Sequence, residues 1–299
     1  MSMTPQSLGV FSCVVDGDRR FHLDALRWYA TLHRIVGVDP KDMVVCAVDG
    51  TDSDVLGFLR SEGVAVLDVA AFDARSPHCN KISGALALAA RGVDGLAVLT
   101  DTDVAFLDDP RRVRLEAGAV GLRVVGSGNP PLEVLQLVFD AAGVAVPGVV
   151  ELDLVPGVST ARGHANGGLY LVPGGILANV ARGWSRWARW LLEHLDLLGQ
   201  WSTFVDQTAM TLALADEGIG AHSLGIRWNF PSQKNPKRFP DGLDAPSAIH
   251  YHTALTGRGL LEATGVVVVD ERIRVANAAI AQVWHVALPG GGGAGAASS

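Results

Sequence analysis

The chain has 299 residues, of which 48% are hydrophobic and 18% are charged, and its formal net charge is -7 at neutral pH. This composition excludes a disordered or fibrous protein and provides enough apolar side chains for a sizeable core. Nucleic acid is a poor partner for an acidic chain, because non-specific binding of phosphates needs a basic face. No uncharged apolar run reaches the ~18 residues of a membrane-spanning helix, so no transmembrane segment is predicted.

The cysteines and the N-terminal region indicate the compartment. Cys13, Cys46 and Cys79 have no metal-ligand spacing, and the first two lie in apolar runs. They are predicted to be buried free thiols in a reducing compartment. Residues 1–10 contain no basic region followed by an apolar stretch, so no signal peptide is predicted. We expect a cytoplasmic protein, and the sequence leaves open both peripheral attachment to a membrane and formation of a homo-oligomer.

The first hundred residues alternate between short apolar runs and stretches with helical periodicity. The stretches predict helices at residues 21–36, 52–61 and 80–91, with Thr51 or Asp52 as the cap of the second. Buried strands separated by helices indicate a mostly parallel sheet covered on both faces, in which ligands bind beyond the carboxyl ends of the strands. The predicted strands are residues 8–15, 43–48, 64–69 and 96–100.

The second half is less regular, but it shows no internal repeat and no sharp change in composition. We therefore predict a single domain over residues 1–288, followed by a disordered Gly/Ala/Ser-rich tail at residues 289–299. The predicted strands of this half are residues 119–125, 169–172 and 248–251. The predicted helices are residues 132–142, 176–198, 207–217 and 271–286.

The strongest chemical signal follows the strand predicted at residues 96–100. The chain there reads LAVLTDTDVAF, so Asp101 and Asp103 come directly after a buried strand. Two carboxylates at this position can converge on one hard cation, since Mg²⁺ and Mn²⁺ prefer oxygen ligands and often bind through carboxylates and substrate phosphates. A D-x-D triplet alone is weak evidence and is often a solvated acidic turn. Its place at the ligand-binding edge of the sheet favours a metal site.

The D-x-D segment resembles the metal-binding motif of GT-A glycosyltransferases, which place a divalent metal between these aspartates and a nucleoside diphosphate. Four other segments resemble elements of such enzymes, in the same order along residues 8–257. The last of them resembles the His-aromatic strand of retaining enzymes such as glycosyltransferase family 8. These segments are Asn80-Lys81, Asn166-Gly167-Gly168, Asp206-Gln207 and His250-Tyr251-His252.

The resemblance implies a GT-A-like α/β fold, with a nucleotide-binding half at residues 1–110 and a donor-sugar and acceptor half at residues 111–288. It implies Mg²⁺ or Mn²⁺ at Asp101 and Asp103, with His250 or His252 completing the shell. His250 matches the family position better. The family normally continues to Lys-Pro-Trp, whose lysine contacts phosphate. This chain lacks that segment, and Arg258 is the residue that the resemblance offers in place of the lysine. The implied donor-binding residues are Asp16, Asn80, Lys81, Asp101, Thr102, Asp103, Asn166, Gly167, Gly168 and Arg258.

Asp206 and Gln207 are the implied catalytic residues. The resemblance to retaining families places them beside the anomeric carbon, where they stabilise positive charge. Asp206 would serve equally as the N-cap of the helix predicted at residues 207–217, a role that Asp fills well. Asp16 has a similar alternative, because Asp16-Gly17 also reads as a turn. Asn166 would bond sugar hydroxyls, and the two glycines after it would let the backbone approach the sugar.

The sequence therefore predicts a metal-dependent glycosyltransferase that moves a glucosyl or mannosyl group from a UDP- or GDP-sugar to a saccharide or small hydroxylated acceptor, with retention. No residue decides between the two nucleotides. A sugar-phosphate nucleotidyltransferase is an alternative, but residues 14–19 lack the Gly-rich loop that usually follows the first strand of such enzymes. A second alternative is a non-catalytic nucleotide-sugar-binding protein, and the presence of Asp101, Asp103 and Asp206 argues against it.

Overall fold

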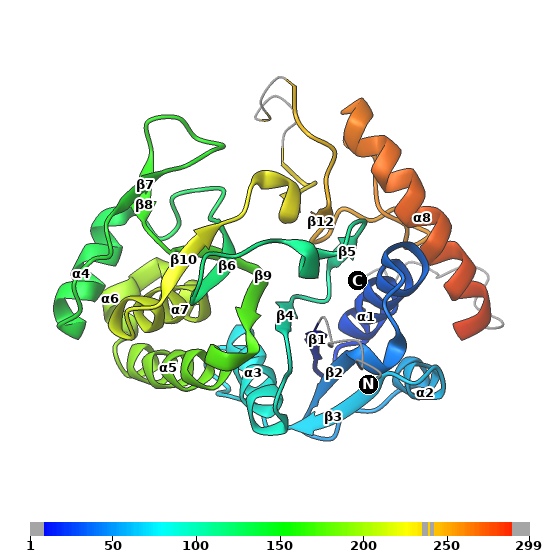
Figure 1. Ribbon diagram of the computed structural model, residues 1–299, viewed down its shortest axis with the longest axis horizontal. Helices are drawn as coiled ribbons and strands as arrows, with labels where there is room; N and C mark the ends of the chain where they lie inside the picture. The colour runs from blue at the N-terminus through cyan, green and yellow to red at the C-terminus, as the bar shows by residue number, and fades with distance from the viewer. Residues whose placement is uncertain (1–8, 235–238, 240–241, 289–299) are drawn as a thin grey trace, which may run out of the picture.

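The structure, a computed structural model, describes residues 9–234, 239 and 242–288. Its centre is a seven-stranded sheet with the order β10-β6-β9-β4-β1-β2-β3 (Figure 1). The first four strands of the chain run parallel, β9 is antiparallel to both of its neighbours, and β10 is parallel to β6. The strands are β1 (Gly9–Val15), β2 (Met43–Val48), β3 (Ala65–Val69), β4 (Leu96–Thr100), β6 (Ala119–Val124), β9 (Ala165–Pro173) and β10 (Gly220–Ser223).

Helices cover both faces of this sheet, so the predicted α/β class with a mostly parallel sheet is confirmed. One hydrophobic cluster packs α1, α2 and α8 on one face, and a second packs α3, α4, α5 and α7 on the other. The helices are α1 (Arg19–Thr31), α2 (Asp54–Ser61), α3 (Asn80–Arg91), α4 (Leu132–Ala142), α5 (Gly174–Glu193), α6 (Leu195–Leu198), α7 (Val205–Asp216) and α8 (Val267–Ala287).

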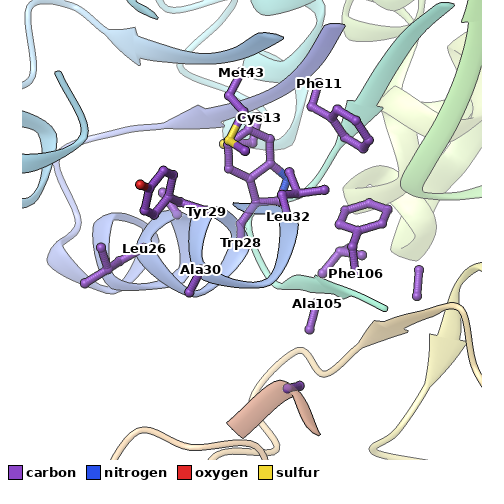
Figure 2. Close-up of a cluster of buried hydrophobic side chains, with 14 of the residues drawn as sticks. Phe11, Cys13, Leu26, Trp28, Tyr29, Ala30, Leu32, Met43, Ala105 and Phe106 are labelled. Carbon is purple, nitrogen blue, oxygen red and sulfur yellow. The ribbon is translucent and has the colours of Figure 1, made fainter. Parts of the chain in front are cut away.

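Strand β2 shows why the central strands are continuous apolar runs. Val44 and Cys46 belong to the cluster under α3, whereas Met43 and Val45 belong to the cluster under α1. Successive side chains point to opposite faces of a strand, so both sets must be apolar where both faces are covered. Figure 2 shows the first of these clusters, in which Trp28 of α1 lies among the side chains of the neighbouring strands.

A small second sheet places the end of the D-x-D segment beside the strand that ends at His250. It has the order β11 (Phe230–Pro231), β12 (Ala248–His250) and β5 (Val104–Phe106). Strands β5 and β12 are antiparallel, and His250 is the partner of Val104 in their register. The backbone N–H of Tyr251 also donates to the carbonyl of Asp103 at 3.1 Å. This pairing brings together segments that are almost 150 residues apart in the sequence. A further pair, β7 (Val149–Glu151) and β8 (Ser159–Ala161), forms a hairpin-like ribbon.

Several predicted boundaries shift. The predicted cap of α2 is wrong: the Ser53 side chain, not that of Thr51 or Asp52, accepts from the backbone N–H of Leu56. The strand predicted at residues 169–172 is longer, because pairing on both edges extends β9, and the helix predicted at residues 176–198 is interrupted at His194. The tail at residues 289–299 and Leu8, the first residue of the first predicted strand, lie outside the described residues.

Two predictions from composition can be compared with the structure. The three cysteines are buried and unpaired, as predicted. Among the described residues, no helix has the length and apolar character needed to cross a membrane.

Candidate active site

A cavity with a volume of about 470 Å³ opens at the carboxyl ends of β1 and β4. This is the edge where an α/β sheet of this kind binds its ligands. The cavity collects residues from six separate segments of the chain, because each segment ends or begins at this edge. Of the residues predicted for the site, those that line it are Asp16, Asn80, Lys81, Asp101, Thr102, Asp103, Asn166, Asp206, Gln207, His250 and His252.

Asp103, His250 and His252 form a group that could hold a metal ion. Each offers one ligand atom, and the three atoms lie within 4.8 Å of one another. The Nε2 atom of His250 lies 3.1 Å from Oδ1 of Asp103. The two imidazole rings are stacked, with their centroids 3.7 Å apart. Both histidines predicted as alternative ligands therefore lie at the same place, beside the second aspartate of the D-x-D segment.

The hydrogen-bond partners of the two Nδ1 atoms are compatible with a metal at Nε2. Nδ1 of His252 lies 3.2 Å from the carbonyl oxygen of His250, and Nδ1 of His250 lies 3.0 Å from Oδ1 of Asn229. Oxygen atoms of this kind accept hydrogen bonds, so a neutral ring with its hydrogen on Nδ1 satisfies this contact and keeps a lone pair on Nε2. Imidazole nitrogen and carboxylate oxygen are suitable ligands for a divalent cation. The amide nitrogen of Gln233 lies 3.3 Å from Nε2 of His252.

The charges in this group are strongly coupled. Burial alone would raise the pKa of Asp103, but His250 beside it lowers that pKa to about 2. Burial would lower the pKa of His250, but the carboxylate of Asp103 raises it above the ordinary histidine value. Burial and the neighbouring His250 lower the pKa of His252 to about 4. A proton on His250 thus occupies the position between imidazole and carboxylate that a metal ion would take.

Lys81 joins two carboxylates at the floor of the cavity. Its Nζ atom lies 2.6 Å from Oδ1 of Asp101 and 3.2 Å from Oδ2 of Asp206, and it donates to the carbonyl of Gly167 at 3.3 Å. Burial would lower the pKa of Lys81, but the two carboxylates raise it well above the ordinary range. Asp101 is not in the group of three ligand residues, because its carboxylate is turned to Lys81. Its role as a metal ligand stays a prediction.

The two glycines of β9 make room for side chains of the site. A Cβ atom at Gly167 would lie 2.9 Å from Nζ of Lys81, and one at Gly168 would lie 2.5 Å from Nδ1 of His250. Contacts this short are not tolerated between real atoms, so Lys81 and His250 occupy the space that side chains at these positions would need. Neither glycine lines the cavity.

Asp206 lies within α7, which begins at Val205, so its predicted alternative role as an N-cap is wrong. The residue is buried, and its backbone carbonyl accepts from Nε1 of Trp184 at 2.7 Å. Arg258 lies in an exposed turn and does not line the cavity. Among the described arginines, Arg20 lines the cavity, and its Nη2 atom donates to the carbonyl of His252 at 3.0 Å.

Sequence reasoning missed Arg20 and Asn229. Arg20 lies just past the carboxyl end of β1, so the rule that ligands bind beyond strand ends could have found it. Asn229 lies in an irregular segment with no recognisable pattern, and no signal in the sequence marks it.

We expect the apparent affinity for Mn²⁺ to fall as the pH is lowered. A metal must displace the proton from His250, whose pKa is raised, so competition begins above the ordinary histidine pKa of about 6.5. His252, with a pKa of about 4, adds no competing proton near neutral pH. Below the pKa of His250, one displaced proton weakens binding by about tenfold per pH unit. Calorimetric titration with Mn²⁺ at several pH values measures this slope, and a constant affinity from pH 8 to pH 5.5 would exclude His250 as a ligand.

Gly168→Ala is expected to weaken Mn²⁺ binding by about 10- to 100-fold, because the added methyl group must displace the His250 ring. Gly175→Ala is the matched control, since a Cβ atom at Gly175 meets nothing within 4 Å. Both variants should be checked for folding by circular dichroism. Equal Mn²⁺ affinity in the two variants would show that the His250 position does not matter for the metal.

Comparison with known proteins gives the fold. No protein-family model and no curated protein matches the sequence. The structure is similar to that of the galactosyltransferase LgtC in complex with donor and acceptor sugar analogues, with a TM-score of 0.55 and 14% identity over 93% of this chain and 99% of LgtC. It is also similar to the glycosyltransferase GlyE of Streptococcus pneumoniae, with a TM-score of 0.53 and 10% identity over 93% of this chain and 63% of GlyE. The chain therefore has the fold of GT-A-type glycosyltransferases, as its motifs predicted.

Proposed function

We propose that this protein is a divalent-metal-dependent glycosyltransferase that moves a hexose, glucosyl or mannosyl, from a UDP- or GDP-sugar to a saccharide or small hydroxylated acceptor. The observation that supports the proposal most strongly is that Asp103, His250 and His252 converge in one cavity. Lys81 lies in the same cavity, where it pairs with the carboxylates of Asp101 and Asp206. The cavity volume of about 470 Å³ lies within the usual range of small-molecule sites, about 300–1,000 Å³.

The charges of the cavity favour a nucleoside diphosphate bound together with a cation. Four carboxylates line it, those of Asp16, Asp101, Asp103 and Asp206, whereas Lys81 and Arg20 bring two cationic groups. A diphosphate alone would be repelled by such a surface. Mg²⁺ or Mn²⁺, held by Asp103 and the two histidines, would supply the positive charge that offsets both the carboxylates and the leaving group.

The residues of the chain have separate tasks in the transfer. The bond from the anomeric carbon to the diphosphate oxygen breaks, and a bond to the acceptor oxygen forms. Asp206 and Gln207 border the cavity at the start of α7, where a carboxylate stabilises positive charge developing on the sugar ring. Lys81 forms an ion pair with Asp206 and keeps its carboxylate in place. Asn166, on β9, offers its amide to sugar hydroxyls.

A thermal-shift screen tests the proposed donor class. Nucleotide sugars are added to the protein with and without Mn²⁺, because a ligand at 100 times its dissociation constant adds about 2.7 kcal/mol to the stability of the folded state. We expect stabilisation by a UDP- or GDP-hexose only when Mn²⁺ is present. If no nucleotide sugar stabilises the protein under either condition, the proposed donor class is wrong.

Retention of configuration is proposed from the resemblance of the histidine strand and the Asp206-Gln207 element to retaining enzymes. The acceptor hydroxyl then attacks from the side of the leaving group, whose phosphate oxygen takes the proton, so no protein base is needed. Asp206→Asn is expected to lower kcat severely while KM for the donor changes little, because the charge matters mainly in the transition state. Proton NMR of the first product identifies the anomer. A β-linked product from an α-linked donor would assign Asp206 as a general base instead.

A further inference from the structure

Asn229 lies behind the metal-ligand group and does not line the cavity. It follows the short helical turn Ile226–Trp228 and is almost completely buried, with 1% of its surface exposed. Its Oδ1 atom lies 3.0 Å from Nδ1 of His250, and its Nδ2 atom lies 3.0 Å from Oδ1 of Asn166. This one side chain therefore connects β12, which carries a ligand, with β9, which carries the glycines.

The direction of each hydrogen bond in this chain of contacts follows from one backbone group. The N–H of Gly168 can only donate, and it donates to Oδ1 of Asn166 at 3.0 Å. The atom of Asn166 that faces Asn229 is therefore an oxygen, so Asn229 presents its NH₂ group to Asn166 and its carbonyl to His250. A carbonyl only accepts. Nδ1 of His250 therefore faces an acceptor, and this contact is a hydrogen bond when the ring carries a hydrogen on Nδ1.

We propose that Asn229 is a positioning residue that holds His250 in the Nδ1–H tautomer and thereby keeps the Nε2 lone pair available to a divalent cation. This inference rests on the proposed function and extends its metal site. Histidines that bind metals commonly donate their other N–H to a carbonyl or carboxylate, which fixes the tautomer and the ring orientation. Among the described residues, the amide oxygen of Asn229 is placed to accept this hydrogen bond from His250.

The neighbouring carboxylate makes such a residue necessary. Oδ1 of Asp103 lies 3.1 Å from Nε2 of His250 and attracts a hydrogen to that nitrogen through a charge-assisted hydrogen bond. In the Nε2–H tautomer the hydrogen would lie where the cation must bind. The carbonyl of Asn229 opposes this by attracting the hydrogen to Nδ1. Without Asn229, the Asp103 carboxylate stabilises the Nε2–H tautomer, and the hydrogen on Nε2 blocks the nitrogen that would bind the cation.

Asn229 is itself held firmly. Nη1 of Arg123 donates to its backbone carbonyl at 3.3 Å, and Arg123 is 2% exposed. The amide plane is fixed from the other side by Asn166, which accepts from both Asn229 and Gly168. Arg123 does not line the cavity, whereas Asn166 does and keeps its bond from Gly168 when the Asn229 amide is removed. Of the two side chains that the Asn229 amide contacts, His250 is the one in the metal-ligand group, so an effect on the cation is expected through His250.

The test compares two substitutions of similar shape. Asn229→Leu removes the acceptor, and Asn229→Asp keeps it. In the metal-free protein we expect Asn229→Leu to bind Mn²⁺ about 10- to 100-fold more weakly than the wild type, as found when such supporting groups are removed. Asn229→Asp is expected to bind more tightly than Asn229→Leu. Nitrogen NMR of ¹⁵N-histidine-labelled protein, at a pH where His250 is neutral, should show Nδ1–H in the wild type and in Asn229→Asp, but Nε2–H in Asn229→Leu.

Asn277→Ala controls for the loss of a structural amide. Asn277, on α8, donates to and accepts from the backbone of Leu261, away from the cavity. This variant should lose thermal stability but keep the Mn²⁺ affinity and the His250 tautomer of the wild type. If Asn229→Leu binds Mn²⁺ like the wild type, or if its His250 keeps the Nδ1–H tautomer, the inference is overturned.

Failure of the proposed function would look different, because no nucleotide sugar is used in these measurements. A wild-type protein that binds no Mn²⁺ would contradict the metal-dependent function and this inference together. Normal Mn²⁺ binding without turnover of any nucleotide sugar would contradict the function alone and leave the role of Asn229 intact.

Discussion

Asp103→Asn is expected to lower kcat/KM for a nucleotide sugar by about 10²- to 10³-fold, the usual effect of removing one group that stabilises transition-state charge. The substitution keeps the size of the side chain and the backbone bond from Tyr251, but it removes the carboxylate that faces His250. Mn²⁺ binding should weaken in parallel, because Asp103 supplies the charged ligand of the group. Steady-state kinetics and calorimetric titration with Mn²⁺ measure the two effects.

Asp94→Asn is the control for this prediction. Asp94 is exposed and lies near the opposite end of β4, so the substitution removes the same charge without touching the cavity. Its kcat/KM and Mn²⁺ affinity should equal those of the wild type. Full activity of Asp103→Asn in the presence of EDTA would exclude a metal at the D-x-D segment.

Lys81→Met is expected to destabilise the protein by about 3–5 kcal/mol, the usual cost of leaving a buried charge without its partner. The Lys81 side chain is 16% exposed and that of Asp206 is 3% exposed, so water compensates little for the lost ammonium group. Asp101 and Asp206 would then repel each other across the cavity floor. Urea unfolding of the metal-free protein measures the change.

A second substitution tests the cause of this loss. Lys81→Met combined with Asp206→Asn removes one of the two uncompensated carboxylates and should recover part of the free energy of unfolding. Lys41→Met, which removes an exposed lysine paired with Asp39, should change stability little. If Lys81→Met is as stable as Lys41→Met, then Lys81 does not hold the two carboxylates together.

The sequence predicted those helices and strands whose bounds are marked by a pattern in the neighbouring residues. The helix at Asn80–Arg91 and the strands at Met43–Val48 and Leu96–Thr100 have the predicted bounds, because their apolar patterns end at turn residues. Asp101 and Asp103 were placed at the ligand edge by the strand before them. Whether His250 or His252 could bind a metal was left open, since their spacing shows only that they share a face.

What the sequence could not predict depends on long-range pairing. The antiparallel direction of β9 and the pairing of β5 with β12 arise between segments far apart in the chain, and no local pattern encodes them. The pairing of β5 with β12 puts His250 beside Asp103, whereas the carboxylate of Asp101 forms an ion pair with Lys81. Asn229 could not be predicted for the same reason, since its partners lie on two other strands.

Metal-dependent glycosyl transfer is tested most directly by measuring the release of nucleoside diphosphate from UDP- and GDP-hexoses, with Mn²⁺ or with EDTA, and with or without saccharide acceptors. We expect release and a transferred sugar in the presence of Mn²⁺, with little or none in EDTA. A nucleotidyltransferase would instead join a nucleoside triphosphate to a sugar phosphate and release pyrophosphate, and a binding protein would release nothing. Nucleoside diphosphate released equally fast in EDTA and in Mn²⁺, or not released from any hexose donor, would contradict a metal-dependent glycosyltransferase.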